Sequence, residues 1–153
     1  MQVLLFTHSV MRWLVLGSLG WSFYKAYVAY TNNKPFTKTL NKLRHWTATV
    51  AHIQLMIGII LYSQSQTVKA LFAGLSGNGH ITDPVFFGVI HITLMLLAVV
   101  LVTLGSAMAK RKSSDSEKSK TMYIWFGVAL LVIFVAIPWP FSPLAQRPYI
   151  RPL

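Results

Sequence analysis

The sequence predicts an all-α integral membrane protein, a four-helix bundle in which every helix crosses the bilayer. Of the 153 residues, 54% are hydrophobic and only 11% are charged, whereas about a quarter of the residues in soluble domains are charged. The apolar residues gather in long segments, and the stretches between them are short and basic. Because one span needs about 20 residues, the length suits a single domain, 1–153, with short loops.

The spans are separated by residues that stop helices. The stretch Asn32–Pro35 follows the first apolar segment and predicts a turn. Pro84 suits the first turn of the third helix, and the cluster Pro138–Pro140 ends the fourth. The stretch 110–120 is polar and rich in Ser, and it predicts a mobile loop. The predicted spans are therefore about 3–30, 42–65, 84–109 and 121–137.

The distribution of Lys and Arg predicts the orientation of the bundle. The first connection carries five basic residues and the third carries five, whereas the second carries only Lys69 and the C-terminal tail only Arg147 and Arg151. Loops rich in Lys and Arg stay in the cytoplasm. The bundle is therefore expected to be N-out and C-out. The two basic sets are Lys25, Lys34, Lys38, Lys42 and Arg44, then Lys110, Arg111, Lys112, Lys118 and Lys120.

Several classes of function are excluded by composition. The net charge is +11, but the basic residues lie between apolar segments with little aromatic or Gly interleaving, so nucleic-acid binding is not expected. The absence of Cys excludes disulfides, thiolate metal sites, Cys nucleophiles and covalently attached haem. No Asp or Glu lies in a predicted span, which disfavours an ion-coupled transporter. Phosphate-binding loops and hydrolase motifs are also missing.

Four ionisable residues lie inside the predicted spans: His8, Arg12, His52 and His91. Burying an ionisable side chain in lipid costs free energy, so each of these residues suggests a function. His8 precedes Lys25 by 17 residues and His91 precedes Lys110 by 19, which places them about 25 and 28 Å above the cytoplasmic edge at 1.5 Å per residue. His52 follows Arg44 by eight residues, about 12 Å above that edge. His8 and His91 are thus expected to share the outer half.

Two His residues at one depth on different helices suit the two axial positions of a b-type haem iron. Arg12 lies one turn from His8, at i+4, where it could pair with a haem propionate. The small residues Gly17, Gly20 and Gly88 would allow close helix approach or a flat ring. The alternatives are hydrogen bonding between helices without a cofactor, and metal or proton chemistry. Arg12 could equally extend its head group toward the membrane surface.

His52 has no partner of its own type at its depth. It is expected to bridge helices, to contact a quinone or to relay protons, although it remains a candidate cofactor-binding residue. His80 follows Gly77, Asn78 and Gly79 in the outer loop, and it is expected to be solvated.

A resemblance adds to this interpretation. Three features carry it: the motif His8-Ser9-x-x-Arg12-Trp13, the residues His52 and His91 in later spans, and the end Ile137–Pro140. In these features the chain resembles small bacterial membrane proteins described as cytochrome b-like. More distantly, it is similar to the four-helix membrane cytochromes b of bacteria. The resemblance implies a bacterial inner (cytoplasmic) membrane location, and it implies haem ligation by His8, His52 and His91 and electron exchange with quinones.

The chain departs from that pattern in its last helix. Residues 121–137 contain no His, whereas the cytochromes with two haems use ligands there. Three intramembrane His residues cannot complete two sites of two ligands each. The expectation is therefore one haem b, with His8 and His91 on the iron and Arg12 near the propionates.

Two functions follow from the sequence. The first is an electron-transfer protein between the membrane quinone pool and an acceptor at the outer face. The second is a non-catalytic accessory or assembly subunit of a larger respiratory or other membrane complex, in which the buried polar residues serve packing or recognition. The sequence leaves open whether the protein is an enzyme.

Overall fold

The computed structural model describes residues 1–74 and 82–151, and it confirms the all-α fold. Within these ranges, four helical segments are long and apolar enough to cross a membrane. Their length and composition identify a multi-pass membrane protein that lies in a lipid bilayer. The four segments are α1 (Gln2–Thr31), α2 (Lys38–Gln64), the continuous stretch Asp83–Arg111, and α6 (Asp115–Ala136).

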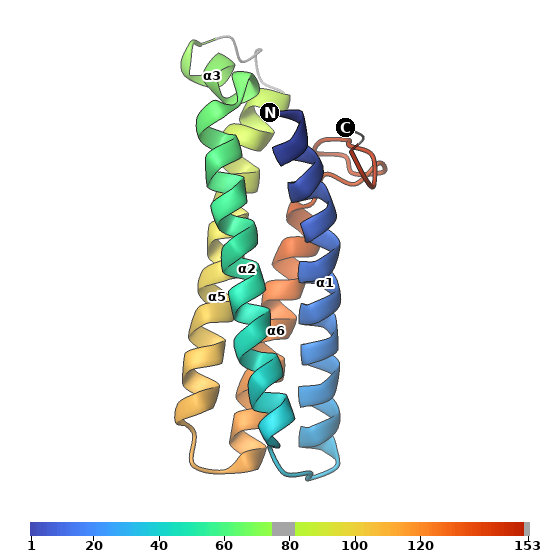
Figure 1. The fold of residues 1–153 in the computed structure, drawn as a ribbon, viewed down its shortest axis with the longest axis vertical. Helices are drawn as coiled ribbons and strands as arrows, with labels where there is room; N and C mark the ends of the chain where they lie inside the picture. The colour runs from blue at the N-terminus through green and yellow to red at the C-terminus, as the bar shows by residue number, and fades with distance from the viewer. Residues whose placement is uncertain (75–81, 152–153) are drawn as a thin grey trace.

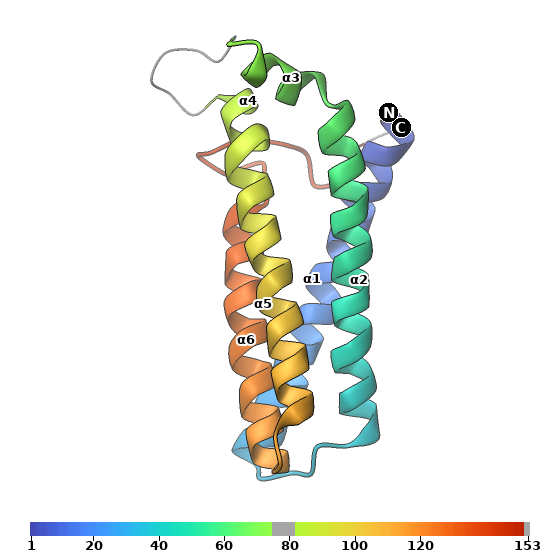
Figure 2. The ribbon, with the colours of Figure 1, turned by 90° about the vertical axis from the view of Figure 1, so that its left-hand side faces the viewer.

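The four spans form an elongated antiparallel bundle (Figures 1 and 2). Each helix packs on two neighbours, in the cyclic order α1, α2, α5 (His91–Arg111), α6 and back to α1. Both chain ends lie at one end of the bundle, and the α1–α2 and α5–α6 connections lie at the other (Figure 1). The basic residues of these two connections predict that the second end faces the cytoplasm. The end that holds the termini is called the outer end below.

The third span is wound in three parts. It begins with one turn, α4 (Asp83–Val85), continues as the π-helical η1 (Phe86–Ile90), and then becomes α5. The backbone N–H of His91 donates to Phe86 O, five residues back, which is the hydrogen bond of a π turn. Single π turns occur frequently at functional sites. Here the turn ends where His91 begins α5.

Two helices start earlier than predicted, because their caps lie in polar sequence. Thr37 caps α2, with its hydroxyl accepting from the Leu40 N–H. Ser114 caps α6 by accepting from the Glu117 N–H, while its hydroxyl donates to the Glu117 carboxylate. The predicted mobile loop 110–120 is therefore mostly helical. A short helix unpredicted by the sequence, α3 (Gln66–Phe72), follows α2 after Ser65.

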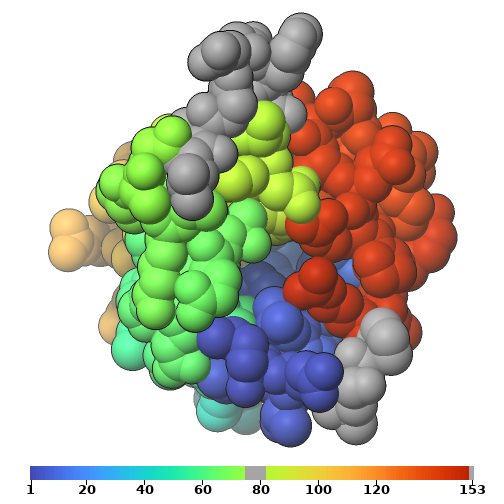
Figure 3. Space-filling model, turned by 90° about the horizontal axis from the view of Figure 1, so that it is seen from above, coloured from blue at the N-terminus to red at the C-terminus, as the bar shows by residue number. Residues whose placement is uncertain are grey.

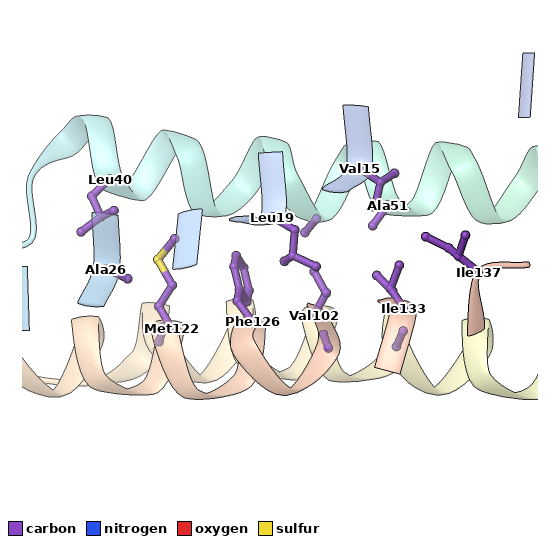
Figure 4. Packing of buried hydrophobic residues seen from close by; sticks show 14 of the residues in the cluster. Val15, Leu19, Ala26, Leu40, Ala51, Val102, Met122, Phe126, Ile133 and Ile137 are labelled. Atoms are coloured by element: carbon purple, nitrogen blue, oxygen red, sulfur yellow. The ribbon is translucent and has the colours of Figure 1, made fainter. Parts of the chain in front are cut away.

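The centre of the bundle is packed by apolar side chains from all four spans (Figure 4). Phe126, Met122 and Val102 are fully buried, and Leu19 is 1% exposed. Close contacts use small residues, as at Gly105, where a Cβ would lie 2.3 Å from the Trp125 Cβ. Without a hydrophobic driving force between helices in lipid, such van der Waals contacts hold the spans together.

Candidate functional site

A cavity of about 550 Å³ occupies the outer half of the bundle. Its floor is apolar and includes Val15, Ala51, Ala98 and Val102. Its mouth lies at the outer end, where Gln64 and Gln66 and the C-terminal tail contribute to the rim. Viewed from above, the N-terminal residues, the top of α2 and the tail surround a recess (Figure 3). The size is typical of small-molecule and cofactor sites.

His8 and His91 lie together in this cavity. Both side chains line it, and their ring centroids are 6.4 Å apart with the ring planes at 70°. His8 comes from α1, and His91 stands at the first residue of α5, directly after the π turn. The approach of these two residues, expected from counting along the helices, is present in the structure.

The two imidazoles keep nitrogens available to a ligand. His91 Nδ1 lies 2.8 Å from Ala136 O, so this nitrogen carries the proton in the neutral ring and donates to the carbonyl. His91 Nε2 is then left with its lone pair. Across residues 1–74 and 82–151, no hydrogen bond forms to either Nε2, and His8 Nδ1 is buried without a partner. A hydrogen bond to the second ring nitrogen is how metal-binding His residues are usually oriented.

Helix α2 forms the wall behind His8, and Gly58 and Gln54 provide this contact. A Cβ at Gly58 would lie 3.3 Å from His8 Cε1, so the imidazole packs directly on the glycine backbone. Gln54 Nε2 donates to His8 O at 2.9 Å, while its Oε1 is buried and has no partner among the residues that the structure describes. Neither residue was predicted, because Gly and Gln in a span carry no functional signal by themselves.

Arg12 is held inside the mouth by the C-terminal tail. Its guanidinium Nη2 donates to Tyr149 O, and the Trp13 indole N–H donates to the same carbonyl at 3.1 Å. The Arg12 Cζ lies 5.6 Å from the Trp13 ring centroid and 5.9 Å from that of Trp139. Arg12 Nε is buried without a hydrogen-bond partner within the described ranges. The cation therefore lies beside both aromatic rings, within the range of cation–π contacts.

The tail contributes two further arginines, Arg147 and Arg151, to the cavity lining. Arg147 forms an ion pair with Asp83 at the start of α4, and its guanidinium lies 4.9 Å from the Phe87 ring centroid. The Arg151 N–H donates to Ser9 Oγ at 3.1 Å, which fastens the tail to α1. From the sequence, these arginines were expected in an outward-facing C-terminal tail and were used only in the charge count that predicts the orientation.

His52 lies apart from the other two His residues. Its Nε2 is 3.1 Å from Thr103 Oγ1, and its Nδ1 is 2.7 Å from Ala48 O. Thr103 follows His91 by twelve residues on the same helix, about 18 Å nearer the cytoplasmic end. His52 is exposed on the bundle surface, in a shallow groove of about 380 Å³ between α2 and α5. It links these helices and does not meet His8 or His91.

Other expectations have mixed outcomes. A Cβ at Gly17 or Gly20 would meet no atom within 4 Å, so these glycines do not mediate close helix approach. Gly88 does, because a Cβ there would lie 2.5 Å from Leu71 Cδ2. His80 lies outside the described residues. Within those residues, no three His, Asp or Glu side chains gather as metal ligands.

The site thus combines an apolar cavity, two imidazoles with ring centroids 6.4 Å apart, and arginines at the mouth. Such a site suits an amphipathic ligand with an anionic end. Compared with known protein families, curated proteins and solved structures, the chain matches none.

Proposed function

We propose that this protein binds one b-type haem in the outer half of the membrane and transfers electrons. The observation that carries the proposal is the His8–His91 pair, with ring centroids 6.4 Å apart inside the cavity. An imidazole nitrogen binds a first-row transition metal at about 2 Å, so two imidazoles on opposite sides of one metal have ring centres roughly 6 Å apart. The separation therefore suits one shared iron.

The other residues fit the same group. A porphyrin supplies the remaining iron ligands itself, so two protein ligands suffice and no third ligand residue is needed. The apolar floor suits the macrocycle, and Arg12 at the mouth suits a carboxylate. Since the chain contains no Cys, the haem would be held without covalent links. When bound, haem supplies one-electron redox chemistry.

The position of the cavity supports a direction for the electron path. Its mouth is at the outer end, so an acceptor at the outer face would approach the site most closely. A membrane quinone is the natural donor from the lipid, and a larger respiratory or other membrane complex is a further partner. We place the protein in a bacterial inner (cytoplasmic) membrane. We assign His52 to helix bridging, because Thr103 and Ala48 already engage both of its nitrogens.

The test is the absorption spectrum of the detergent-purified protein after expression with added haem. We expect a red protein whose Soret band shifts when dithionite is added. His8→Ala and His91→Ala should each abolish stable haem binding, because each removes one of the two imidazoles that would hold the iron. His52→Ala is the matched control, as it removes an intramembrane imidazole outside the cavity, and its spectrum should stay that of the wild type.

Two results would count against this proposal. A colourless wild type would favour the accessory-subunit function, in which the buried polar residues serve packing or recognition. Bleaching by His52→Ala alone, with red His8 and His91 variants, would show that the iron lies elsewhere.

A further inference from the structure

We propose that the cavity mouth is a two-cation clamp, formed by Arg12 of α1 and Arg151 of the C-terminal tail, that recognises a ligand with two carboxylates at its polar end. This inference rests on the proposed function and deepens it, because it identifies the outward-facing end of the ligand. It also gives the C-terminal tail a role in ligand selection.

The charge balance at the mouth is the first argument. Three arginines line the cavity, and no Asp or Glu is among its lining residues within the described ranges. Arg147 is neutralised by its ion pair with Asp83. In the part of the chain that the structure describes, neither Arg12 nor Arg151 forms an ion pair with a carboxylate. Two positive charges are therefore left for a ligand.

Two hydrogen bonds between a side chain and the backbone hold the tail near Arg151 against the part of α1 that carries Arg12. Arg12 donates to Tyr149 O, two residues before Arg151 in the tail. The Arg151 N–H in turn donates to Ser9 Oγ, and Ser9 lies three residues before Arg12, on a neighbouring face of α1. Both arginines thus stand at the same part of the rim, although they are far apart in sequence.

The Arg12 guanidinium is held in place before any ligand arrives. Trp13 and Trp139 lie within 6 Å of it, at 5.6 and 5.9 Å, and these two rings contact each other with centroids 5.8 Å apart. Trp139 is only 8% exposed, and its indole N–H donates to Phe134 O at 2.8 Å. A fixed guanidinium can bind a carboxylate with little loss of side-chain entropy.

The cavity and the clamp together define a ligand class. The apolar floor accepts a large apolar body, and two cations at the mouth accept two anionic groups that point outward. A ligand with one carboxylate would leave one cation without a partner in a partly desolvated site, which costs free energy. The two propionates of haem meet this requirement.

The experiment compares two probes that share the same iron and macrocycle. Ferric haem and its dimethyl ester, which lacks both carboxylate charges, are titrated into the purified apoprotein in detergent and followed by the Soret band. The wild type should prefer haem over the ester. Arg12→Gln and Arg151→Gln should each lower haem affinity roughly tenfold, because one charge-assisted pair is lost, and leave ester affinity unchanged. Arg111→Gln, at the cytoplasmic end, is the control and should change neither.

The outcomes separate the clamp from the proposed function. Equal binding of haem and ester by the wild type would overturn the clamp and leave haem binding intact. If neither probe binds, the proposed function fails and the clamp with it. If Arg12→Gln or Arg151→Gln weakens both probes equally, the arginine acts only by docking the tail, and the clamp is wrong. Arg12→Lys, which keeps the charge, should retain part of the preference for haem.

Discussion

The outer and inner halves of the bundle use the same four helices but treat buried polar groups in opposite ways. In the inner half, Arg44 is 6% exposed, and its guanidinium donates to Asn41 Oδ1 and to Ser106 O and Oγ. The nearby hydroxyls of Ser22 and Thr47 are 2.7 Å apart and hydrogen-bonded. These groups satisfy one another and link α2 to its neighbours.

In the outer half, polar atoms without partners surround a hollow. His8 Nδ1, Arg12 Nε and Gln54 Oε1 are all buried and unpartnered within the described ranges, and all three residues line the cavity. In the inner half the hydroxyl of Ser119 also lacks a partner within the described ranges, but Ser119 does not line this cavity. Unsatisfied polar groups in lipid are costly. The inner half thus pairs most of its buried polar groups internally, whereas the outer half leaves several open beside a cavity, as the proposed ligand site requires.

The first prediction tests which half faces the cytoplasm, and its effect is all or none. A reporter enzyme that is active only outside the cytoplasm should be active when fused after Leu153. The same reporter should be silent when inserted at Ser114, between two helices at the basic end. The reverse pattern would place the His8–His91 cavity at the cytoplasmic face and would remove the outer-face acceptor from the proposed function.

The second prediction tests whether the filled core is packed more tightly than the surroundings of the cavity. It compares the same substitution, Phe to Ala, at one site in each region. Phe126 is fully buried beside Met122 and Val102 (Figure 4). Phe126→Ala should lower the free energy of unfolding by about 3–5 kcal/mol, since it leaves a void in a filled core. Phe87 borders the existing cavity. Phe87→Ala should therefore cost less than about 2 kcal/mol, because it mainly enlarges a hollow that is already present.

Thermal unfolding of the two variants in detergent, without added haem, would measure this difference. Equal losses of stability would indicate that the outer half is as tightly packed as the inner half in solution. In that case the cavity would not be a stable feature of the free protein.

The sequence was sufficient for the fold and for the central pair of the site. Long apolar segments and basic loops predicted four spans, and counting from the loops predicted the meeting of His8 and His91. These inferences succeed because helical rise is constant and a polar residue in lipid must turn toward a partner.

Other parts of the site depend on long-range packing that no local pattern encodes. Arg151 reaches Ser9 on α1 only because the chain after Pro138 turns back over this helix. Gly58 contacts His8 because of the relative rotation of two helices, which the sequence does not show. Gly17 and Gly20 are glycines in a span as Gly58 is, but a Cβ at either position would meet no atom within 4 Å. The early starts of α2 and α6, in contrast, could have been predicted from the sequence, because Thr37 and the pair Ser114 and Glu117 are recognisable N-cap residues.

The last prediction, whose expected effect is the smallest, uses the different surroundings of Gly58 and Gly17. At Gly58 a new Cβ would sit 3.3 Å from His8 Cε1, a contact so tight that the imidazole must shift by a few tenths of an ångström. At Gly17 a new Cβ would meet nothing within 4 Å. Both changes replace Gly by Ala inside a helix, which favours the helix by about 0.5–1 kcal/mol. Any difference between the two variants therefore reports the contact with His8.

We expect Gly58→Ala to weaken haem binding less than tenfold and to shift the Soret band, because an imidazole that would hold the iron is displaced and not removed. Gly17→Ala should leave both the affinity and the band position at wild-type values. Haem titration and spectra of the two variants, recorded in the same detergent, make the comparison. Identical behaviour of the pair would mean that α2 does not position His8. The outer half would then bind its ligand through α1 and α5 alone, with α2 serving only as a wall.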